Sequence, residues 1–123
     1  MSTIIATANA PAAIGPYVQA RVAGGFVFVS GQLGMNPDGV LPADFETQAH
    51  NSLRNLRAIL EEAGSSLPKV VKATVFLGDL ENFAKLNAIY AEYFKAPCPA
   101  RSCVEVARLP RDAQVEIEVI AER

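Results

Sequence analysis

The spacing of apolar side chains along the chain changes from short runs to a helical repeat and back again. Residues 17–22 and 26–32 form two short apolar runs joined by Ala23-Gly24-Gly25, which predicts two strands around a turn. From residue 45 onward the apolar positions recur at intervals of three and four, which predicts a helix. These positions are Phe45, Ala49, Leu53, Leu56, Leu60 and Ala63. Gly64 fits the position just beyond the end of that helix.

The second half of the chain alternates the same two patterns. Residues 70–78 are rich in β-branched side chains and predict a strand. Asp79 is a suitable N-cap for a second helix, which ends before Pro97. The apolar side of this helix consists of Phe83, Leu86, Tyr90, Tyr93 and Phe94. The segments 101–107 and 114–121 then predict two strands that pair as a hairpin around Pro110-Arg111.

Two helices can cover only one face of a sheet of five or six strands. We therefore expect an α+β fold in which residues 1–123 form a single domain, with a mixed sheet and both helices on one side. Both faces of the strand at 26–29 are apolar, so the face without helices also needs a cover. The sequence therefore predicts a homo-oligomer in which neighbouring subunits bury that second face.

Composition and charge argue against several classes of function. The formal net charge of −2 and the lack of a basic stripe argue against binding to nucleic acid. No apolar run reaches transmembrane length, and residues 1–6 do not resemble a secretory signal, so we expect neither a membrane span nor export. Cys98 and Cys103 are poorly spaced for a disulfide in an extended segment, and the single histidine leaves no zinc set. These features predict a cytoplasmic protein with reduced cysteines and no metal.

Polar side chains interrupt the two C-terminal strands, which are otherwise apolar. Arg101 lies in the first, and its planar guanidinium group could hold a small carboxylate through two parallel hydrogen bonds; a surface ion pair is the alternative. Glu116 lies in the second, and a solvated side chain on an exposed strand face is the commoner fate of a glutamate. Glu118 shares its side of the strand and is the residue most easily confused with it.

Five short motifs carry a resemblance to a known family. They are Ala13-Ile-Gly-Pro-Tyr17, Ser30-Gly-Gln32, Asn87-Ala-Ile-Tyr90, Pro99-Ala-Arg-Ser-Cys-Val-Glu-Val106 and Val115-Glu-Ile-Glu118. Together they make the chain resemble the RidA/YjgF family of reactive-intermediate deaminases, from about residue 4 to the C-terminal end. The resemblance implies a chorismate-mutase-like α+β fold and a homotrimer with three sites between subunits.

The resemblance also implies an activity. Pyridoxal-phosphate enzymes such as threonine dehydratase release 2-enamine and 2-imino acids, including 2-iminobutanoate and 2-iminopropanoate. Members of the family hydrolyse these compounds to 2-keto acids and ammonia, a form of metabolite damage control that uses no metal or organic cofactor.

Individual residues receive roles from the same resemblance. Arg101 and Glu116 would be catalytic, the first clamping the substrate carboxylate and the second positioning the water. The residues lining the substrate site with Arg101 would be Tyr17, Ser30, Gly31, Asn87 and Cys103. From the sequence alone, Tyr17 could equally be a half-buried structural residue, and Asn87 could simply bond a neighbouring loop.

The two cysteines have different expected positions. Cys103 has the same strand parity as Arg101, so both side chains should face the same side of the sheet. A thiol invites a nucleophile hypothesis, but the single histidine, His50, is predicted on the surface of the first helix and cannot activate it. We therefore expect Cys103 to line the pocket without a role in turnover, and Cys98 to have no catalytic role.

The predicted hairpin gives an estimate of the distance between the two catalytic candidates. A turn at Pro110-Arg111 places Arg101 opposite about Ile120. Glu116 then lies about four residues along the hairpin, or roughly 13 Å from Arg101 at ~3.3 Å per residue. A four-carbon substrate cannot bridge that distance, so we expect Arg101 of one subunit to meet Glu116 of a neighbour.

Two other classes of function remain as alternatives. The same pocket could capture a small carboxylate without catalysis, in a binding or chaperone-like trimeric module, and Glu116 distinguishes this from hydrolysis because only hydrolysis needs an acid–base group. A nuclease or translation inhibitor is the third reading, and the acidic charge balance argues against it.

Overall fold

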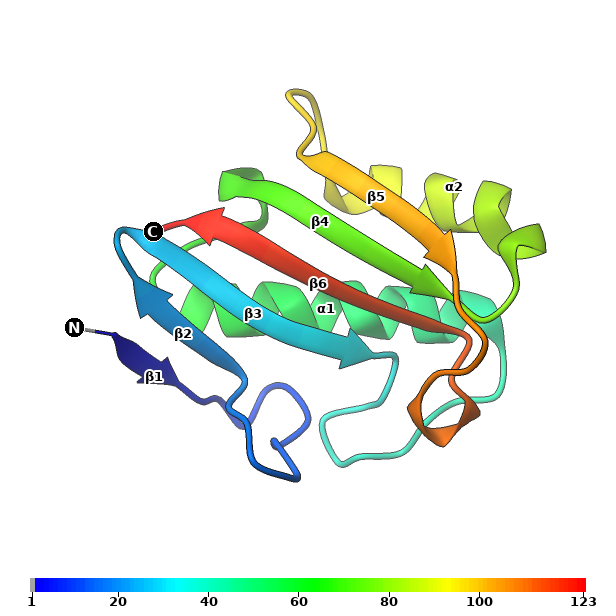
Figure 1. Ribbon diagram of the computed structural model, residues 1–123, viewed down its shortest axis with the longest axis horizontal. Coiled ribbons are helices and arrows are strands. Elements are labelled where there is room, and N and C mark those ends of the chain that lie inside the picture. Colours follow the sequence, from blue (N-terminus) through cyan, green and yellow to red (C-terminus); the bar gives the residue numbers. More distant parts are fainter. Residues whose placement is uncertain (1) are drawn as a thin grey trace.

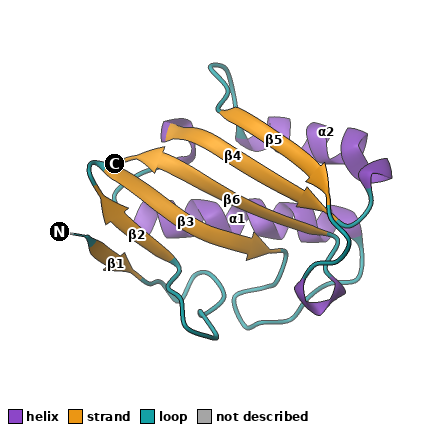
Figure 2. Ribbon diagram, in the orientation of Figure 1, coloured by secondary structure: helices purple, strands orange, loops and turns teal. Residues whose placement is uncertain are grey.

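The computed structural model describes residues 2–123, and in this part of the chain six strands form one sheet with the helices packed behind it (Figures 1 and 2). The strands are β1 (Thr3–Ile5), β2 (Ala20–Ala23), β3 (Phe26–Leu33), β4 (Val70–Leu77), β5 (Ala100–Glu105) and β6 (Val115–Glu122). The helices are α1 (Phe45–Glu62) and α2 (Phe83–Tyr93), with short 3₁₀ turns η1 (Leu67–Lys69), η2 (Leu80–Asn82) and η3 (Pro110–Asp112). Both α-helices lie on the same side of the sheet, which confirms the predicted α+β arrangement.

Helix α1 begins and ends where the sequence pattern predicts. The Asp44 carboxylate accepts a hydrogen bond from the Thr47 backbone N–H at 3.0 Å and another from its hydroxyl at 2.7 Å, which satisfies the exposed start of the helix. Gly64 follows the last turn with a φ of 80°, a left-handed conformation that favours glycine. The buried side of α1 includes Leu53, Leu56 and Leu60, which pack against the sheet.

Three local details differ from the prediction. Strand β1 was not predicted, and it adds an edge strand beside β2. The predicted strand at 17–22 is shorter, because Tyr17 and Val18 lie in the loop before β2. Asp79 caps η2 rather than α2, since its carboxylate accepts the Glu81 N–H at 2.9 Å and α2 begins only at Phe83.

The predicted hairpin between the last two strands is wrong. The sheet order is β1-β2-β3-β6-β4-β5, so β4 lies between β5 and β6 (Figure 1). Arg101 therefore pairs with Ala73 of β4, and Ala73 pairs in turn with Val119. The connection between β5 and β6 is not a tight turn: it contains η3, in which Arg111 and Asp112 have positive φ. It carries the chain past the end of β4, which therefore lies between the two strands that the connection joins.

The two faces of the sheet differ in their cover. On the helix side, Val115, Ile117, Val119 and Ala121 of β6 are buried. On the open side, Phe26 and Phe28 of β3 are 40% and 46% exposed, and Ile4 is 64% exposed. The open face around Ile4, Phe26 and Phe28 thus has no cover within residues 2–123, as the oligomer hypothesis requires. None of the helices in this described part of the chain is both long and apolar enough to cross a membrane.

Candidate functional site

The carboxyl group of Glu116 lies on the open face of the sheet, directly against Gly31 of the neighbouring strand. A Cβ atom at Gly31 would lie 2.8 Å from Cδ and 2.9 Å from Oε2 of Glu116, so the carboxyl group would have to move to make room for it. The pairing between β3 and β6 shifts its register between Val29 and Gln32, and Gly31 lies in this irregular stretch. The missing side chain on β3 therefore provides the space that the carboxyl group occupies.

The surroundings of Glu116 favour its protonated form. Burial raises the pKa of the Glu116 carboxyl group above its ordinary value, and the nearby charge of Glu118 raises it further. A carboxyl group whose pKa is moved toward neutrality can take up and release a proton during a reaction. Of the neighbouring glutamates Glu116 and Glu118 on this side of β6, Glu118 is exposed and Glu116 is half-buried, so the structure distinguishes the pair.

A cavity of about 280 Å³ opens beside Glu116. Tyr17 and Gly31 line it together with the apolar side chains of Ile14 and Met35. Arg111 of η3 forms part of the wall, where its Nη1 donates to the Gly39 carbonyl at 2.7 Å. The cavity therefore combines one acid–base group, a phenol ring and a mostly apolar lining, which suits a small organic substrate.

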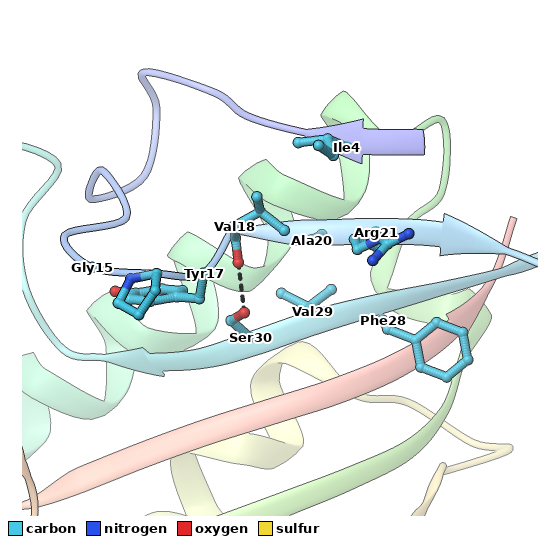
Figure 3. A pocket seen from close by; sticks show the side chains of 10 residues that line it. Ile4, Gly15, Tyr17, Val18, Ala20, Arg21, Phe28, Val29 and Ser30 are labelled. Atoms are coloured by element: carbon cyan, nitrogen blue, oxygen red, sulfur yellow. Dashed lines mark hydrogen bonds between the residues drawn. The ribbon is translucent and has the colours of Figure 1, made fainter. Parts of the chain in front are cut away.

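Tyr17 and Ser30 border a second, more open cavity of about 710 Å³ (Figure 3). The Ser30 hydroxyl donates to the Val18 carbonyl at 2.6 Å, as the dashed line in Figure 3 shows, and so fixes the loop that carries Tyr17 to β3. Tyr17 is 50% exposed and lines both cavities. Four of the predicted residues, Tyr17, Ser30, Gly31 and Glu116, thus gather on one side of the molecule.

Arg101 lies in a separate group of side chains, between β5 and α2. Its guanidinium carbon is 4.8 Å from the centre of the Tyr90 ring and 5.7 Å from the centre of the Phe83 ring. Asn87 is half-buried and falls between these two aromatic residues on the same side of α2, four positions after Phe83 and three before Tyr90. Asn87 therefore lies on the same side of α2 as the two rings that contact Arg101.

Cys103 belongs to the Arg101 group, as its strand parity predicts. It faces the helices and packs against the main core. Burial raises the pKa of its thiol, and the smaller opposing effect of Arg101 does not reverse this, so the thiol form is favoured. His50 is half-buried rather than on the surface, with its Nδ1 2.8 Å from the hydroxyl of Tyr93. Cys98 is an exposed free thiol in the loop before β5.

The two groups of predicted residues lie on opposite faces of the sheet. Arg101 is in register with Ala73 on the helix side, whereas Glu116 pairs with Phe76 and faces the open side. Arg101 and Glu116 are two strands apart across the sheet, and their partners on β4 are three residues apart along that strand. From the usual spacings of strands and residues, this corresponds to a distance of roughly 14 Å. One chain alone therefore does not bring Arg101 and Glu116 to the same substrate.

Sequence reasoning overlooked several residues around these groups. It placed Phe83 and Tyr90 on the apolar side of the second helix and missed that their rings contact Arg101. The sequence signal for this contact is that Phe83 and Tyr90 are seven residues apart, which puts both rings on the same side of the helix with Asn87 between them. It also missed Arg111, which enters the Glu116 cavity only because the β5–β6 connection folds back there. Within residues 2–123, no group of three or more His, Cys, Asp or Glu side chains could hold a metal ion.

Comparisons with known proteins identify relatives over the whole chain. The 2-iminobutanoate/2-iminopropanoate deaminase of Escherichia coli K12 is 54% identical, across 100% of this chain and 99% of the relative. A RutC family protein from Pyrococcus horikoshii is 50% identical, across 98% of both chains.

Solved structures agree with these sequence relatives. The crystal structure of RidA from an Antarctic Psychrobacter has a TM-score of 0.96 and 45% identity, covering 98% of this chain and 99% of that one. The structure of Escherichia coli TdcF with bound serine has a TM-score of 0.94 and 50% identity, covering 98% of each chain. The family model described as Endoribonuclease L-PSP matches residues 7–123. The chain therefore belongs to this family, which is the YjgF/RidA family.

Proposed function

We propose that this protein is a 2-iminobutanoate/2-iminopropanoate deaminase, which hydrolyses 2-imino acids and their enamine tautomers to 2-keto acids and ammonia. The observation that carries the proposal is the half-buried Glu116 carboxyl group, with its raised pKa, beside a small cavity. The curated relative at 54% identity is named for this activity, and another relative was crystallised with serine, a small amino acid.

The chemistry needs a carboxylate clamp and a proton shuttle. Arg101 binds the substrate carboxylate and fixes the neighbouring carbon–nitrogen double bond. Water forms a bond to the carbon of the protonated imine while Glu116 accepts a proton from the water. The product is a tetrahedral carbinolamine, which carries a hydroxyl group and an amino group on the same carbon. Glu116 then returns the proton to nitrogen, the carbon–nitrogen bond breaks, and ammonia leaves with the electron pair. Loss of the remaining hydroxyl proton forms the keto group.

We further propose that the working unit is a homotrimer whose sites lie between subunits. The positions of Arg101 and Glu116 on opposite faces support this, because two copies are needed to place both groups on one substrate. The exposed Phe26 and Phe28 support it as well, since a second subunit would bury them. Light scattering at micromolar concentration tests the proposal: a mass three times that of the chain is expected, and a monomer would refute it.

The remaining predicted residues have supporting roles in this proposal. Tyr17 and Gly31 border the substrate beside Glu116, and Ser30 fixes the Tyr17 loop through its bond to Val18. Asn87 and Cys103 line the site beside Arg101, with Cys103 as a thiol that takes no part in turnover. We place this activity in the cytoplasm, as a defence against reactive intermediates that pyridoxal-phosphate enzymes release.

A coupled assay separates hydrolysis from simple binding. Threonine dehydratase supplies the imino acid, semicarbazide traps what is not hydrolysed, and 2-ketobutyrate release is followed. Wild type should accelerate release, and Arg101→Ala and Glu116→Gln should not. Arg54→Ala and Glu61→Gln, at exposed positions of α1, are matched controls that should behave as wild type. Binding of 2-ketobutyrate without acceleration would identify a carboxylate-binding module instead.

A further inference from the structure

The Arg101 guanidinium group is held by aromatic rings rather than by a carboxylate. The Tyr90 ring centre is 4.8 Å from its central carbon, and the Phe83 ring centre is 5.7 Å away. Within residues 2–123, neither of the salt bridges involves Arg101. A cation over an aromatic ring is attracted by the negative face of the ring, and the attraction grows where water is excluded. Tyr90 is only 7% exposed, so water is largely excluded from its contact with Arg101.

We propose that Tyr90 is a positioning residue that holds the Arg101 guanidinium group ready to bind the substrate carboxylate. This inference rests on the proposed function, because it concerns the same clamp. A ring beneath the planar group leaves its N–H donors free for a carboxylate, whereas a protein carboxylate would occupy them. The rings thus orient the arginine without competing with the substrate.

The ring of Tyr90, and not its hydroxyl group, carries this role. The hydroxyl oxygen is buried and has no hydrogen-bond partner within residues 2–123. Burial raises the pKa of the Tyr90 phenol, and the opposing effect of Arg101 is smaller, so the group stays neutral. It therefore does not form an ion pair with Arg101, and a phenylalanine ring at position 90 should support the guanidinium group equally well.

Substitutions on α2 test the proposal by steady-state kinetics. Tyr90→Leu should raise KM about five- to tenfold with kcat nearly unchanged, because carboxylate binding is lost equally from the ground state and the transition state. Tyr90→Phe should keep the wild-type KM. Tyr93→Leu is the matched control, since Tyr93 contacts His50 and Arg57 instead of Arg101, and it should also keep the wild-type KM. An unchanged KM in Tyr90→Leu, or a raised KM in Tyr90→Phe, would overturn the proposal.

A double-mutant cycle shows whether Tyr90 acts through Arg101. In an Arg101→Lys background, Tyr90→Leu should weaken binding of 2-ketobutyrate, measured by calorimetry, less than it does with Arg101 present. Equal losses in both backgrounds would overturn the proposal. If Tyr90→Leu does not fold, the exposed Phe83→Leu replaces it and should raise the dissociation constant about two- to threefold. Wild type that binds 2-ketobutyrate without hydrolysing the imino acid would refute the proposed function alone; wild type that binds none would refute both.

Discussion

The Glu116 region and the Arg101 region are built by different physical means. Glu116 is fixed by the sheet itself, because its carboxyl group fits the space beside Gly31 on the adjacent strand. Arg101 lies on the edge strand β5 and depends on side chains of α2 for its orientation. Backbone packing thus controls the group proposed for proton transfer, and aromatic packing controls the group proposed for binding. Substitutions should therefore affect catalysis in one region and affinity in the other.

The largest expected effect tests that division directly. Glu116→Gln keeps the shape of the side chain but cannot transfer a proton, so kcat should fall about 10²- to 10⁴-fold while 2-ketobutyrate still binds. Arg101→Ala should instead abolish detectable binding of the keto acid. Coupled kinetics and calorimetry on both variants provide the comparison. Equal loss of binding in the two variants would show that the regions do not divide the work.

Gly31→Ala should have the next largest effect. The added Cβ would lie 2.8 Å from Cδ of Glu116, so the carboxyl group must move, and a displacement of this size can reduce kcat about 100-fold. Gly78→Ala is the control, because its added Cβ would meet nothing closer than 3.4 Å. Circular dichroism should show that both variants fold. A Gly31→Ala variant with wild-type kcat would refute the requirement for close packing.

A smaller effect concerns the pH dependence of catalysis. The proposed mechanism uses Glu116 as a base, so kcat/KM should rise with pH as this group loses its proton. Glu118→Gln removes a charge that raises the pKa of Glu116, and the rising limb should therefore shift toward lower pH. A pH–rate profile measures the shift. An unchanged profile would exclude electrostatic coupling between the two glutamates.

The same pKa shift affects the stability of the folded state. A carboxyl group whose folded-state pKa is raised contributes stability below its unfolded pKa, and this contribution is lost as pH rises through the folded-state value. As pH rises from the unfolded-state pKa of Glu116 to its folded-state pKa, the unfolding free energy of wild type should therefore decline relative to that of Glu116→Gln. Urea unfolding of both variants between acidic and neutral pH checks the sign, and a rise of wild type relative to the variant would contradict it.

The smallest expected effect lies in the Arg101 region. Tyr90→Phe removes a buried hydroxyl group that has no partner within residues 2–123, and it should stabilise the fold by about 1 kcal/mol. Tyr93→Phe removes a hydroxyl group paired with His50 and should destabilise the fold by about 1 kcal/mol. Thermal unfolding of the two variants compares them. Destabilisation by Tyr90→Phe would show that its hydroxyl group has a partner in the assembled protein.

Local patterns predicted most of the secondary structure, because helices and strands depend largely on residues that are close together in the sequence. The repeat from Phe45 to Ala63 and the Gly64 terminator located α1, and strand parity placed Cys103 beside Arg101. The order of the strands depends instead on which distant segments bury each other's side chains. Nothing local in the segment 106–114 indicated that β4 lies between β5 and β6.

The candidate site was predicted as a set of residues but not as an arrangement. The sequence pattern predicts a hairpin that puts Arg101 and Glu116 too far apart for one substrate, and that hairpin does not form. The structure separates them for another reason, because they face opposite sides of the sheet. The contacts of Arg101 with Phe83 and Tyr90 could not be predicted, since they depend on how α2 lies against β5.

The contact between Gly31 and Glu116 has a consequence for how this protein can vary. A residue without a side chain is here as restricted as the carboxyl group that it accommodates, because any larger side chain would meet that group. In a library of all single substitutions selected for growth under imino-acid stress, position 31 should therefore tolerate as few replacements as position 116. Position 118 carries the next side chain on the same face, which is exposed, and it should therefore tolerate many replacements.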